Sequence, residues 1–489
     1  MTSSVTAIAA DALSPNESVG AVVRASSRIA CGSLLVTASS RWKPTSRTAT
    51  TMRSHGGERR PSTHPFVEVG ILEHVSTPHP APPTTTDVLV VGAGPAGSSA
   101  AAWAARSGRD VVLADAAVFP RDKTCGDGLT PRAVAELDQL GLGEWVRSKA
   151  RNRGLRLSGF GQELELEWPS RSLPTIGSAV PRTELDDRIR VAAVESGAVM
   201  AEGAKAVAVT RDGTSVRSVT LQTADGAHEI SCRTLIVADG VRSTLGKQLG
   251  RQWHRDTAFG VAARAYIDSG RSNDEWISSH LELRDAAGTL QPGYGWVFPL
   301  GDGTINIGVG TLATAKRPAP GALRPLLDLY THQRRGEWDL SGELRSVASA
   351  LLPMGGAVSG IAGTNWAIIG DAAACVNPLN GEGIDYGLEG GRMVVDLLDH
   401  PDLTDAWPSL LREHYGQSFS IARRLAGLLT VPRFLPAAGP VGMRSRALMK
   451  VAVRCMGNLI TEADSDLVAR TWRASGTGSL KIDSRPPFS

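Results

Sequence analysis

The chain has 489 residues, of which 42% are hydrophobic and 21% charged, and its formal net charge is only +3. This composition excludes wholesale disorder and a collagen-like repeat. It also argues against a dedicated nucleic-acid-binding protein, because neither the net charge nor the arrangement of Lys and Arg indicates a face that follows phosphates. A mean hydropathy of -0.08 argues against a polytopic membrane protein.

The five cysteines are far apart, odd in number and without the paired spacings of a zinc site or a disulfide framework. They indicate a reducing compartment, and we expect no bound metal.

Residues 1–86 are rich in Ser, Thr, Ala and Pro and show neither helical nor strand periodicity. We expect a disordered, low-complexity leader here, and we favour the hypothesis that the natural start lies later in the chain. A targeting sequence is the alternative, although the apolar run 29–38 is weak and starts far from Met1.

An α/β pattern begins at Asp87. The β-branched run 88–91 predicts a strand buried on both faces, the Ala-rich stretch 98–106 predicts a helix, and the run 111–114 completes a βαβ unit. Two similar apolar runs, 234–238 and 366–369, predict that the same sheet is assembled from distant parts of the chain.

A glycine-rich turn joins the first strand to its helix. In this GxGxxG, Gly92 allows the tight turn, Gly94 lets the backbone approach a pyrophosphate, and Gly97 lets helix and strand pack closely. The helix N-terminus offers free N–H groups to phosphates. Asp115 ends the next strand 18 residues after Gly97, where a carboxylate binds ribose hydroxyls. The arrangement predicts a bound dinucleotide.

Five further motifs follow in order: PRDKTCGDG (120–128), VPR (180–182), DGVRS (239–243), YGWVFP (294–299), and GD (370–371) with NGEGI (380–384). Together they resemble the FAD-dependent geranylgeranyl reductase family over about residues 87–392. The run PRDKTCGDGLTPRAVAEL, the segment SALLPMGG and the ending RPPFS are most similar to the actinobacterial, mycobacterial-type menaquinone reductases of that family.

The resemblance implies tightly bound FAD. The residues that it assigns to the cofactor, with those of the glycine-rich turn, are Gly92, Gly94, Ala96, Gly97, Asp115, Cys125, Gly126, Gly128, Arg182, Ala206, Asp371, Gly383 and Ile384. A second GxGxxG in a strand-turn-helix setting is absent from the sequence, so we expect a transient electron donor, NADPH or another reductant.

The predicted fold class is α/β: a discontinuous Rossmann-like FAD-binding domain of the aromatic-hydroxylase and geranylgeranyl reductase type, with an inserted antiparallel-sheet substrate domain and a helical C-terminal region. The predicted parts are the leader (1–86), the FAD-binding domain (87–255 and 356–398), the substrate domain (256–355) and a basic helical region at the membrane surface (399–489).

Tyr294, Trp296 and Phe298 alternate with smaller residues, so a strand would place all three aromatic rings on one face. An ordinary aromatic core face is one interpretation of this pattern. By resemblance, the strand instead lines an isoprenoid site beside the flavin, and these three residues are the predicted substrate-binding set. Cys125, Tyr294 and Trp296 are the candidate catalytic residues, with Cys125 first and Tyr294 second as proton donor; an ordered water is the alternative donor.

No acidic residue lies between Glu413 and Glu462, whereas basic residues lie among Leu, Val, Phe and Met there: Arg423, Arg424, Arg433, Arg444, Arg446, Lys450 and Arg454. This pattern predicts a surface for anionic lipid, with a solvated helical face as the alternative. We therefore expect a cytoplasmic protein that associates peripherally with the inner face of the plasma membrane.

The resemblance implies reduction of one isoprenyl double bond of the menaquinone side chain, in the second isoprene unit from the ring. Reduction of geranylgeranyl diphosphate or another polyprenyl lipid is the nearest alternative. An FAD-dependent aromatic monooxygenase is the alternative from another reaction class, because such enzymes share several of the same motifs.

Overall fold

The computed structural model describes residues 83–319 and 322–489. The expected leader falls almost wholly outside these residues, so the hypotheses about it stay untested. Order within the described part begins at strand β1 (Thr85–Val91), two residues before the expected start.

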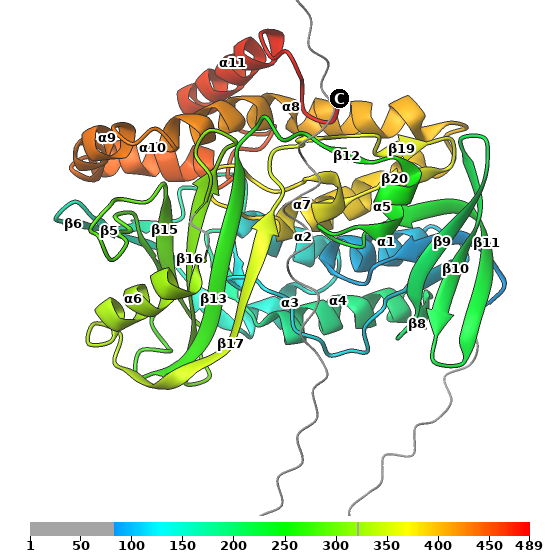
Figure 1. Ribbon diagram of the computed structural model, residues 1–489, viewed down its shortest axis with the longest axis horizontal. Helices are drawn as coiled ribbons and strands as arrows, with labels where there is room; N and C mark the ends of the chain where they lie inside the picture. The colour runs from blue at the N-terminus through cyan, green and yellow to red at the C-terminus, as the bar shows by residue number, and fades with distance from the viewer. Residues whose placement is uncertain (1–82, 320–321) are drawn as a thin grey trace, which may run out of the picture. The chain divides into compact units, whose positions relative to one another are not determined.

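The first layer is an eight-stranded, mostly parallel sheet (Figure 1). Its main path runs β19-β20-β11-β1-β2-β8, and β10 and β9 extend β11 as an antiparallel ribbon. The bounds of the strands other than β1 are β2 (Val111–Ala114), β8 (Val199–Ala201), β9 (Lys205–Asp212), β10 (Ser215–Thr223), β11 (Gly226–Val237), β19 (Ala362–Gly363) and β20 (Trp366–Ile368). The sheet thus joins segments that are more than 250 residues apart in sequence, as Thr85 and Trp366 show.

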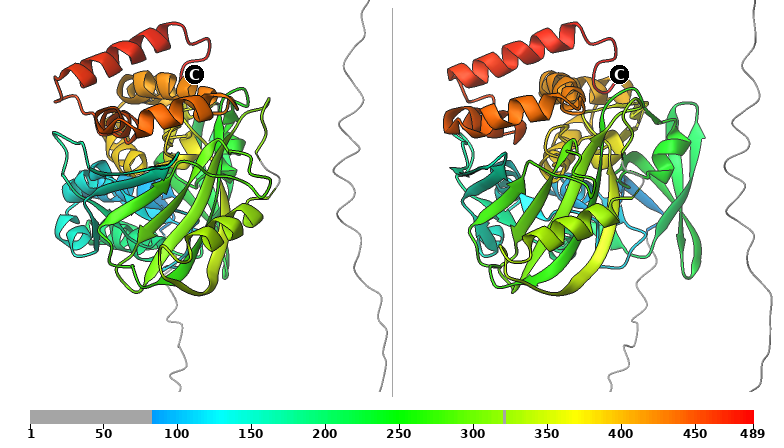
Figure 2. Two further views of the ribbon diagram at one scale, coloured as in Figure 1. Left: turned by 90° about the vertical axis from the view of Figure 1, so that its left-hand side faces the viewer. Right: turned by 60° about the vertical axis from the view of Figure 1, so that its left-hand side comes forward.

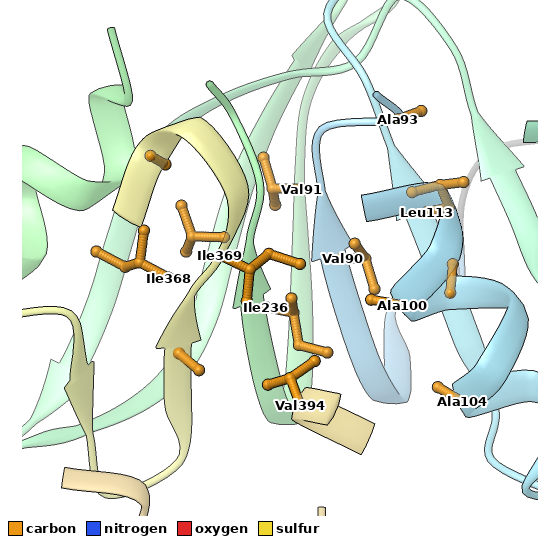
Figure 3. Close-up of a cluster of buried hydrophobic side chains, with 14 of the residues drawn as sticks. Val90, Val91, Ala93, Ala100, Ala104, Leu113, Ile236, Ile368, Ile369 and Val394 are labelled. Atoms are coloured by element: carbon orange, nitrogen blue, oxygen red, sulfur yellow. The ribbon is translucent and has the colours of Figure 1, made fainter. Parts of the chain in front are cut away.

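Helix α1 (Pro95–Arg106) packs on this sheet and against α7 (Ile384–Met393). Proline at its first position suits a helix start, and its row of alanines allows close approach to the strands. Figure 3 shows the resulting core, in which Val90, Ala100, Leu113, Ile236 and Ile368 gather from segments distant in sequence. These aliphatic side chains are buried, as expected for strands covered on both faces, which explains the continuous apolar runs.

The second layer is a seven-stranded sheet in the order β17-β13-β16-β15-β14-β5-β6, antiparallel except for the β14–β5 pair. Its strands are β5 (Gly154–Gly159), β6 (Gln162–Glu167), β13 (Phe259–Ser269), β14 (Trp276–His280), β15 (Gly293–Pro299), β16 (Thr304–Ala313) and β17 (Leu340–Leu352). Helix α6 (Arg324–Arg334) covers one face with an apolar cluster. The opposite face is left to form a site.

Residues 154–167 differ from the expected division, which placed them in the FAD-binding domain. They form β5 and β6 and extend the second sheet beyond β14. Pairing of residues so far apart in sequence is decided by tertiary packing, and here it covers the edge that β14 would otherwise expose.

Helices and short strands complete the described chain. The helices are α2 (Pro131–Gln139), α3 (Gly143–Arg147), α4 (Arg182–Glu195), α5 (Thr244–Leu249), α8 (Leu403–Leu429), α9 (Phe434–Met443), α10 (Arg446–Met456) and α11 (Leu467–Lys481). The strands are β3 (Gly128–Leu129), β4 (Ala150–Asn152), β7 (Gly177–Ala179), β12 (Gln252–Trp253) and β18 (Val358–Ser359). Two 3-10 turns are η1 (Gly370–Ala373) and η2 (Val394–Leu397).

The C-terminal helices lie over the two sheets. Figure 2 shows α11 along the outside of α8, while α9 and α10 lie beside β5 and β6. Among residues 83–319 and 322–489, no helix combines the length and the apolar character needed to cross a bilayer. The α/β fold class, with its inserted antiparallel sheet and helical C-terminal region, is confirmed.

Candidate active site

A cavity of about 960 Å³ lies between the two sheets and continues to α9 and α10. Every residue predicted to bind cofactor or substrate except Gly97 lines it. The carboxyl ends of β1 and β2 contribute the glycine-rich turn and Asp115, and β15 contributes the three aromatic side chains.

The glycine-rich turn leaves no room for a Cβ at Gly92 or Gly97. A Cβ on Gly97 would lie 1.8 Å from the carbonyl oxygen of Gly92, and Gly92 itself has a φ of +106°. Asp115 is fixed beside the turn, because its carboxylate accepts hydrogen bonds from the N–H groups of Ala93 (2.7 Å) and Ala117 (2.8 Å). The free N–H groups at the start of α1 can bind a pyrophosphate, and the fixed carboxylate of Asp115 can bind a ribose.

Asp371 lies in η1, on another part of the cavity wall. The ammonium group of Lys123 is 2.9 Å from its carboxylate. Burial opposes the ionisation of Asp371, but the positive charge of Lys123 outweighs this effect. The pKa of Asp371 therefore lies below its ordinary value. Asp371 is therefore an ionised acceptor for hydroxyl groups. Gly383, the residue before α7, keeps this carboxylate accessible, because a Cβ there would lie 3.3 Å from it.

Arg182 begins α4 and is buried. Its Nε and Nη2 donate to the two carboxylate oxygens of Asp186, at 2.6 and 2.7 Å. Arg121 donates to the same carboxylate at 2.9 Å. The ion pair with Asp186 holds the guanidinium of Arg182 at the cavity wall. Ala206, on β9, lines a different part of the cavity.

Cys125 and Gly126 lie in the loop before β3, which begins at Gly128, and this segment packs against β15. A Cβ on Gly126 or Gly128 would lie 3.1 or 2.8 Å from the ring of Phe298, so these positions exclude larger residues. Burial raises the pKa of the Cys125 thiol, and Arg182 partly offsets this effect. The side chain is thus a neutral thiol, which can donate a proton.

The three aromatic residues of β15 face the cavity together, as expected. Their neighbouring ring centroids are 6.0 Å (Tyr294 and Trp296) and 6.2 Å (Trp296 and Phe298) apart. The hydroxyl of Tyr294 donates to the carbonyl oxygen of Asn380 at 2.6 Å and so connects β15 to the segment before α7. Burial raises the pKa of Tyr294, which keeps the hydroxyl protonated.

Three residues in this region escaped the sequence analysis. Asn306 on β16 donates to the carbonyl oxygen of Cys125 and to the carboxylate of Asp127, both at 2.8 Å. The hydroxyl of Tyr266 donates to the same carboxylate oxygen at 2.6 Å. Burial raises the pKa of Asp127 to about 6. A signal was present for two of them: Asp127 lies inside the CGDG motif, and Asn306 is a lone polar residue in the strand sequence TINIGVG.

The far part of the cavity is apolar. Sheet residues and helix residues face each other there, among them Leu155, Leu157, Phe160, Leu281, Phe434, Leu435, Met443, Met449 and Val453. Such a lining suits a hydrocarbon chain and offers little to a charged ligand.

The predicted lipid-facing surface needs a correction at Arg423 and Arg454. Both side chains are buried: Arg423 lies 2.7 Å from Asp483, and Arg454 lies 2.7 Å from Asp466. The acidic partners lie outside residues 414–461, the segment without acidic residues, so the sequence pattern did not indicate these ion pairs. Exposed basic residues remain at Arg424, Arg433, Arg444, Arg446 and Lys450, together with exposed apolar residues at Leu425, Leu428, Val441, Leu448 and Val451.

The described residues contain no group of His, Cys, Asp or Glu arranged to hold a metal ion.

Comparison with known proteins agrees with this architecture. The FAD binding domain family matches residues 85–292. Menaquinone reductase from Mycobacterium tuberculosis is 64% identical over 405 residues, which cover 83% of this chain and 99% of that protein. Menaquinone reductase from Mycolicibacterium smegmatis is 62% identical over 83% of this chain and all of that protein. The chain belongs to the menaquinone reductase family.

More distant relatives place this family in a wider group. Digeranylgeranylglycerophospholipid reductase 1 from Methanopyrus kandleri is 31% identical over 70% of this chain and 90% of that protein. The solved structure of a geranylgeranyl bacteriochlorophyll reductase-like protein from Thermoplasma acidophilum has a TM-score of 0.65 at 20% identity, covering 80% of this chain and 99% of that one. The flavin-dependent brominase Bmp2 has a TM-score of 0.62 at 19% identity, covering 82% and 100%. These two structures share the fold.

The resemblance to geranylgeranyl reductases is therefore confirmed, and the protein is an FAD-dependent oxidoreductase. The residues of the cavity fit FAD independently of these comparisons, because the turn at Gly92 and Gly97 excludes any side chain and Asp115 is fixed beside it.

Proposed function

We propose that the protein saturates one double bond of the menaquinone side chain, in the second isoprene unit from the ring. A single cavity carries this proposal, since it joins the dinucleotide-binding turn to a compartment lined by apolar side chains. The aromatic side chains of β15 line the same cavity. Such a cavity suits a reaction between a flavin and a hydrocarbon tail from which water is excluded.

The cofactor-binding residues proposed from the sequence fit FAD in the following way. The turn at Gly92, Gly94 and Gly97 receives the pyrophosphate, Asp115 binds a ribose and Asp371 binds the ribityl hydroxyls. The first N–H groups of α7, after Gly383, favour negative charge at that point of the cavity. FAD, when bound, supplies the hydride for the reduction.

The second carbon receives a proton from a side chain of the protein or, as the alternative, from an ordered water. Cys125 and Tyr294 are the proposed donors, because both side chains line the cavity and burial keeps both protonated. Tyr294 is already bonded to the carbonyl oxygen of Asn380, whereas the thiol of Cys125 has no such acceptor bond to break among the described residues. Cys125 is therefore the preferred donor, and Trp296 shapes the wall between them.

The protein reaches its lipid at the inner face of the plasma membrane, through the exposed basic and apolar residues of α9 and α10. Each basic residue near an anionic surface contributes roughly 1 kcal/mol, so Arg433, Arg444, Arg446 and Lys450 suffice for weak docking. Residues of these two helices, among them Leu435, Met443 and Met449, line the apolar compartment. The tail of a lipid therefore has a short path from the bilayer. Electrons come from a separate donor, such as NADPH.

The decisive experiment is mass spectrometry of quinones extracted from host cells with and without this gene. A gene-dependent gain of two hydrogens in the menaquinone tail is expected. Fragment masses then locate the reduced unit. Unchanged quinones, with purified protein that still contains FAD, would refute the proposal.

Reduction of another polyprenyl lipid is the second candidate, and the similarity to an archaeal digeranylgeranylglycerophospholipid reductase favours it over the monooxygenase alternative. Incubation of the reduced protein with geranylgeranyl lipids distinguishes it from menaquinone reduction. Oxygen-dependent NADPH consumption with a hydroxylated product would instead support a monooxygenase.

A further inference from the structure

Glu382 belongs to the NGEGI motif, and neither cofactor binding nor proton donation has yet assigned it a role. Its side chain lies on the cavity wall, next to Gly383 and the start of α7. Its main chain is fixed on both sides: its N–H donates to the side chain of Asn380 (2.9 Å), and its carbonyl oxygen accepts from the N–H of Asn377 (2.7 Å). The carboxyl group is therefore held at one place in the cavity.

The carboxyl of Glu382 lacks a cationic partner within hydrogen-bond distance among the described residues. Oε1 accepts from the hydroxyl of Thr130 at 2.6 Å, and Oε2 makes a weak contact with Asn380 at 3.5 Å. Arg132 is the cation that acts on it, but the guanidinium donates to the carbonyl oxygens of Asn458 and Ile460, both at 2.9 Å. An ionised Glu382 would therefore be poorly compensated.

A second carboxyl makes ionisation harder still. Asp385, on the first turn of α7, is fully buried and accepts from Asn458 at 3.0 Å. Burial, followed by the charge of Asp385, raises the pKa of Glu382 well above its ordinary value. Two further groups face this carboxyl: Tyr294 from β15 and Tyr386 from α7, and burial keeps both of them neutral.

We propose that Glu382 takes up a proton when the flavin is reduced, holds it on the cavity wall, and releases it when the isoprenyl double bond is saturated. The N-terminus of α7 favours an anion at this point, and reduction of a flavin generates one. A carboxylate at the same point would repel that anion, whereas a neutral carboxylic acid does not. Where Glu382 is still ionised beside the oxidised cofactor, the negative charge gained on reduction raises the proton affinity of its carboxylate and draws a proton to it.

The reaction balances with this proton. The carbon–carbon π bond breaks and two C–H bonds form, one from the hydride that the reduced flavin loses as it becomes oxidised, and one from a proton. Glu382 is left as a carboxylate, either directly or after replacing the proton of Cys125 or Tyr294. The next two-electron reduction, by the external donor, is accompanied by uptake of a new proton from solvent. Only the release step depends on the proposed function.

The first test measures the midpoint potential of the bound flavin against pH, without lipid. Each proton taken up with two electrons lowers the potential by about 30 mV per pH unit. One proton for the flavin and one for Glu382 give a wild-type slope twice as steep, over the pH range in which Glu382 is ionised in the oxidised protein and protonated in the reduced protein. Glu382→Gln is expected to halve the slope, and Glu382→Asp is expected to retain the steeper one. Infrared spectroscopy should show a protonated-carboxyl band that Glu382→Gln lacks.

Glu337→Gln is the matched control. The side chain of Glu337 is 33% exposed, pairs with Arg334 at 2.6 Å and does not line the cavity, so its removal should leave the slope unchanged. A steep slope that persists in Glu382→Gln would place the second proton elsewhere and overturn the proposal. A shallow wild-type slope would overturn it even if the variant failed to retain flavin.

The second test is single-turnover reduction of menaquinone by prereduced protein. Glu382→Gln is expected to slow this step by about 10²-fold or more, the range for loss of a proton donor. A normal rate would overturn the release step. A wild type that shows the steep slope but reduces no menaquinone would refute the proposed function and leave the proton uptake by Glu382 standing.

Discussion

The indole N–H of Trp296 donates to the side-chain oxygen of Asn306 at 2.9 Å, and the amide nitrogen of the same Asn306 donates to the loop that carries Cys125. One buried amide thus connects the aromatic wall of β15 to the loop beneath it. The geometry between two candidate catalytic residues depends on a third residue that contacts both.

Asn306→Ala should therefore destabilise the protein. Removal of the amide leaves the indole N–H, the carbonyl oxygen of Cys125 and part of the Asp127 carboxylate short of partners, and each buried group left unpaired costs about 1–3 kcal/mol. We expect the free energy of unfolding in urea to fall by about 3 kcal/mol or more, with loss of flavin. Asn273→Ala, at an exposed position, should change it by less than about 0.5 kcal/mol.

Asp127 predicts a specific pH dependence of stability. Its pKa is raised to about 6 in the folded protein, whereas an unfolded Asp titrates near about 3.9. The folded state therefore binds more protons between these values, so this residue lowers stability as pH rises from about 4 to about 6. Across this pH range, the free energy of unfolding of Asp127→Asn should rise by up to about 3 kcal/mol relative to that of the wild type.

Urea unfolding at a series of pH values checks this expectation. Asp225→Asn, which removes the same charge at an exposed hairpin turn, is the control and should follow the wild-type curve. Parallel curves for wild type and Asp127→Asn would contradict the raised pKa.

Cys125→Ser tests the thiol as proton donor. A serine keeps the size of the side chain but donates a proton far less readily, so single-turnover reduction of the lipid should slow by about 10²-fold or more. Flavin content should stay normal. Cys455→Ser, on α10 and outside the cavity lining, should have no such effect. An unchanged rate in Cys125→Ser would remove it from the reaction.

Ala438→Trp tests the apolar compartment. Ala438 lines the cavity from α9, so an indole there should block the lipid and reduce turnover of menaquinone at least tenfold, while flavin binding and reduction by the electron donor persist. Ala437 is its exposed neighbour and does not line the cavity. Ala437→Trp should retain turnover, and equal losses in both variants would argue against this path.

Charge reversal at Arg444, Arg446 and Lys450 tests membrane docking. These side chains are exposed near the apolar residues Val441 and Leu448, so Glu at all three should weaken binding to anionic liposomes at low salt. Salt should weaken wild-type binding as well, since exposed charges are screened. Reversal of Arg153, Arg217 and Arg324, which are exposed elsewhere, is the matched control. Salt-insensitive binding by the wild type would contradict electrostatic docking.

The local patterns of the sequence were sufficient to predict the glycine-rich turn and the acid beside it. The turn at Gly92 to Gly97 and the acid at Asp115 depend on backbone conformation and on short spacings, which a sequence displays directly. Alternation in YGWVFP likewise predicted that three aromatic rings share a face, because successive side chains of a strand point to opposite sides.

Tertiary packing alone decided the partners of buried polar groups. The bonds of Asn306 to Cys125 and Asp127 join positions about 180 residues apart, and no local pattern encodes them. For the same reason, Arg423 and Arg454 looked available for lipid in the sequence but are neutralised by Asp483 and Asp466 in the fold. The sequence states which side chains are charged. Their solvation and their ion-pair partners depend on which residues the fold places next to them.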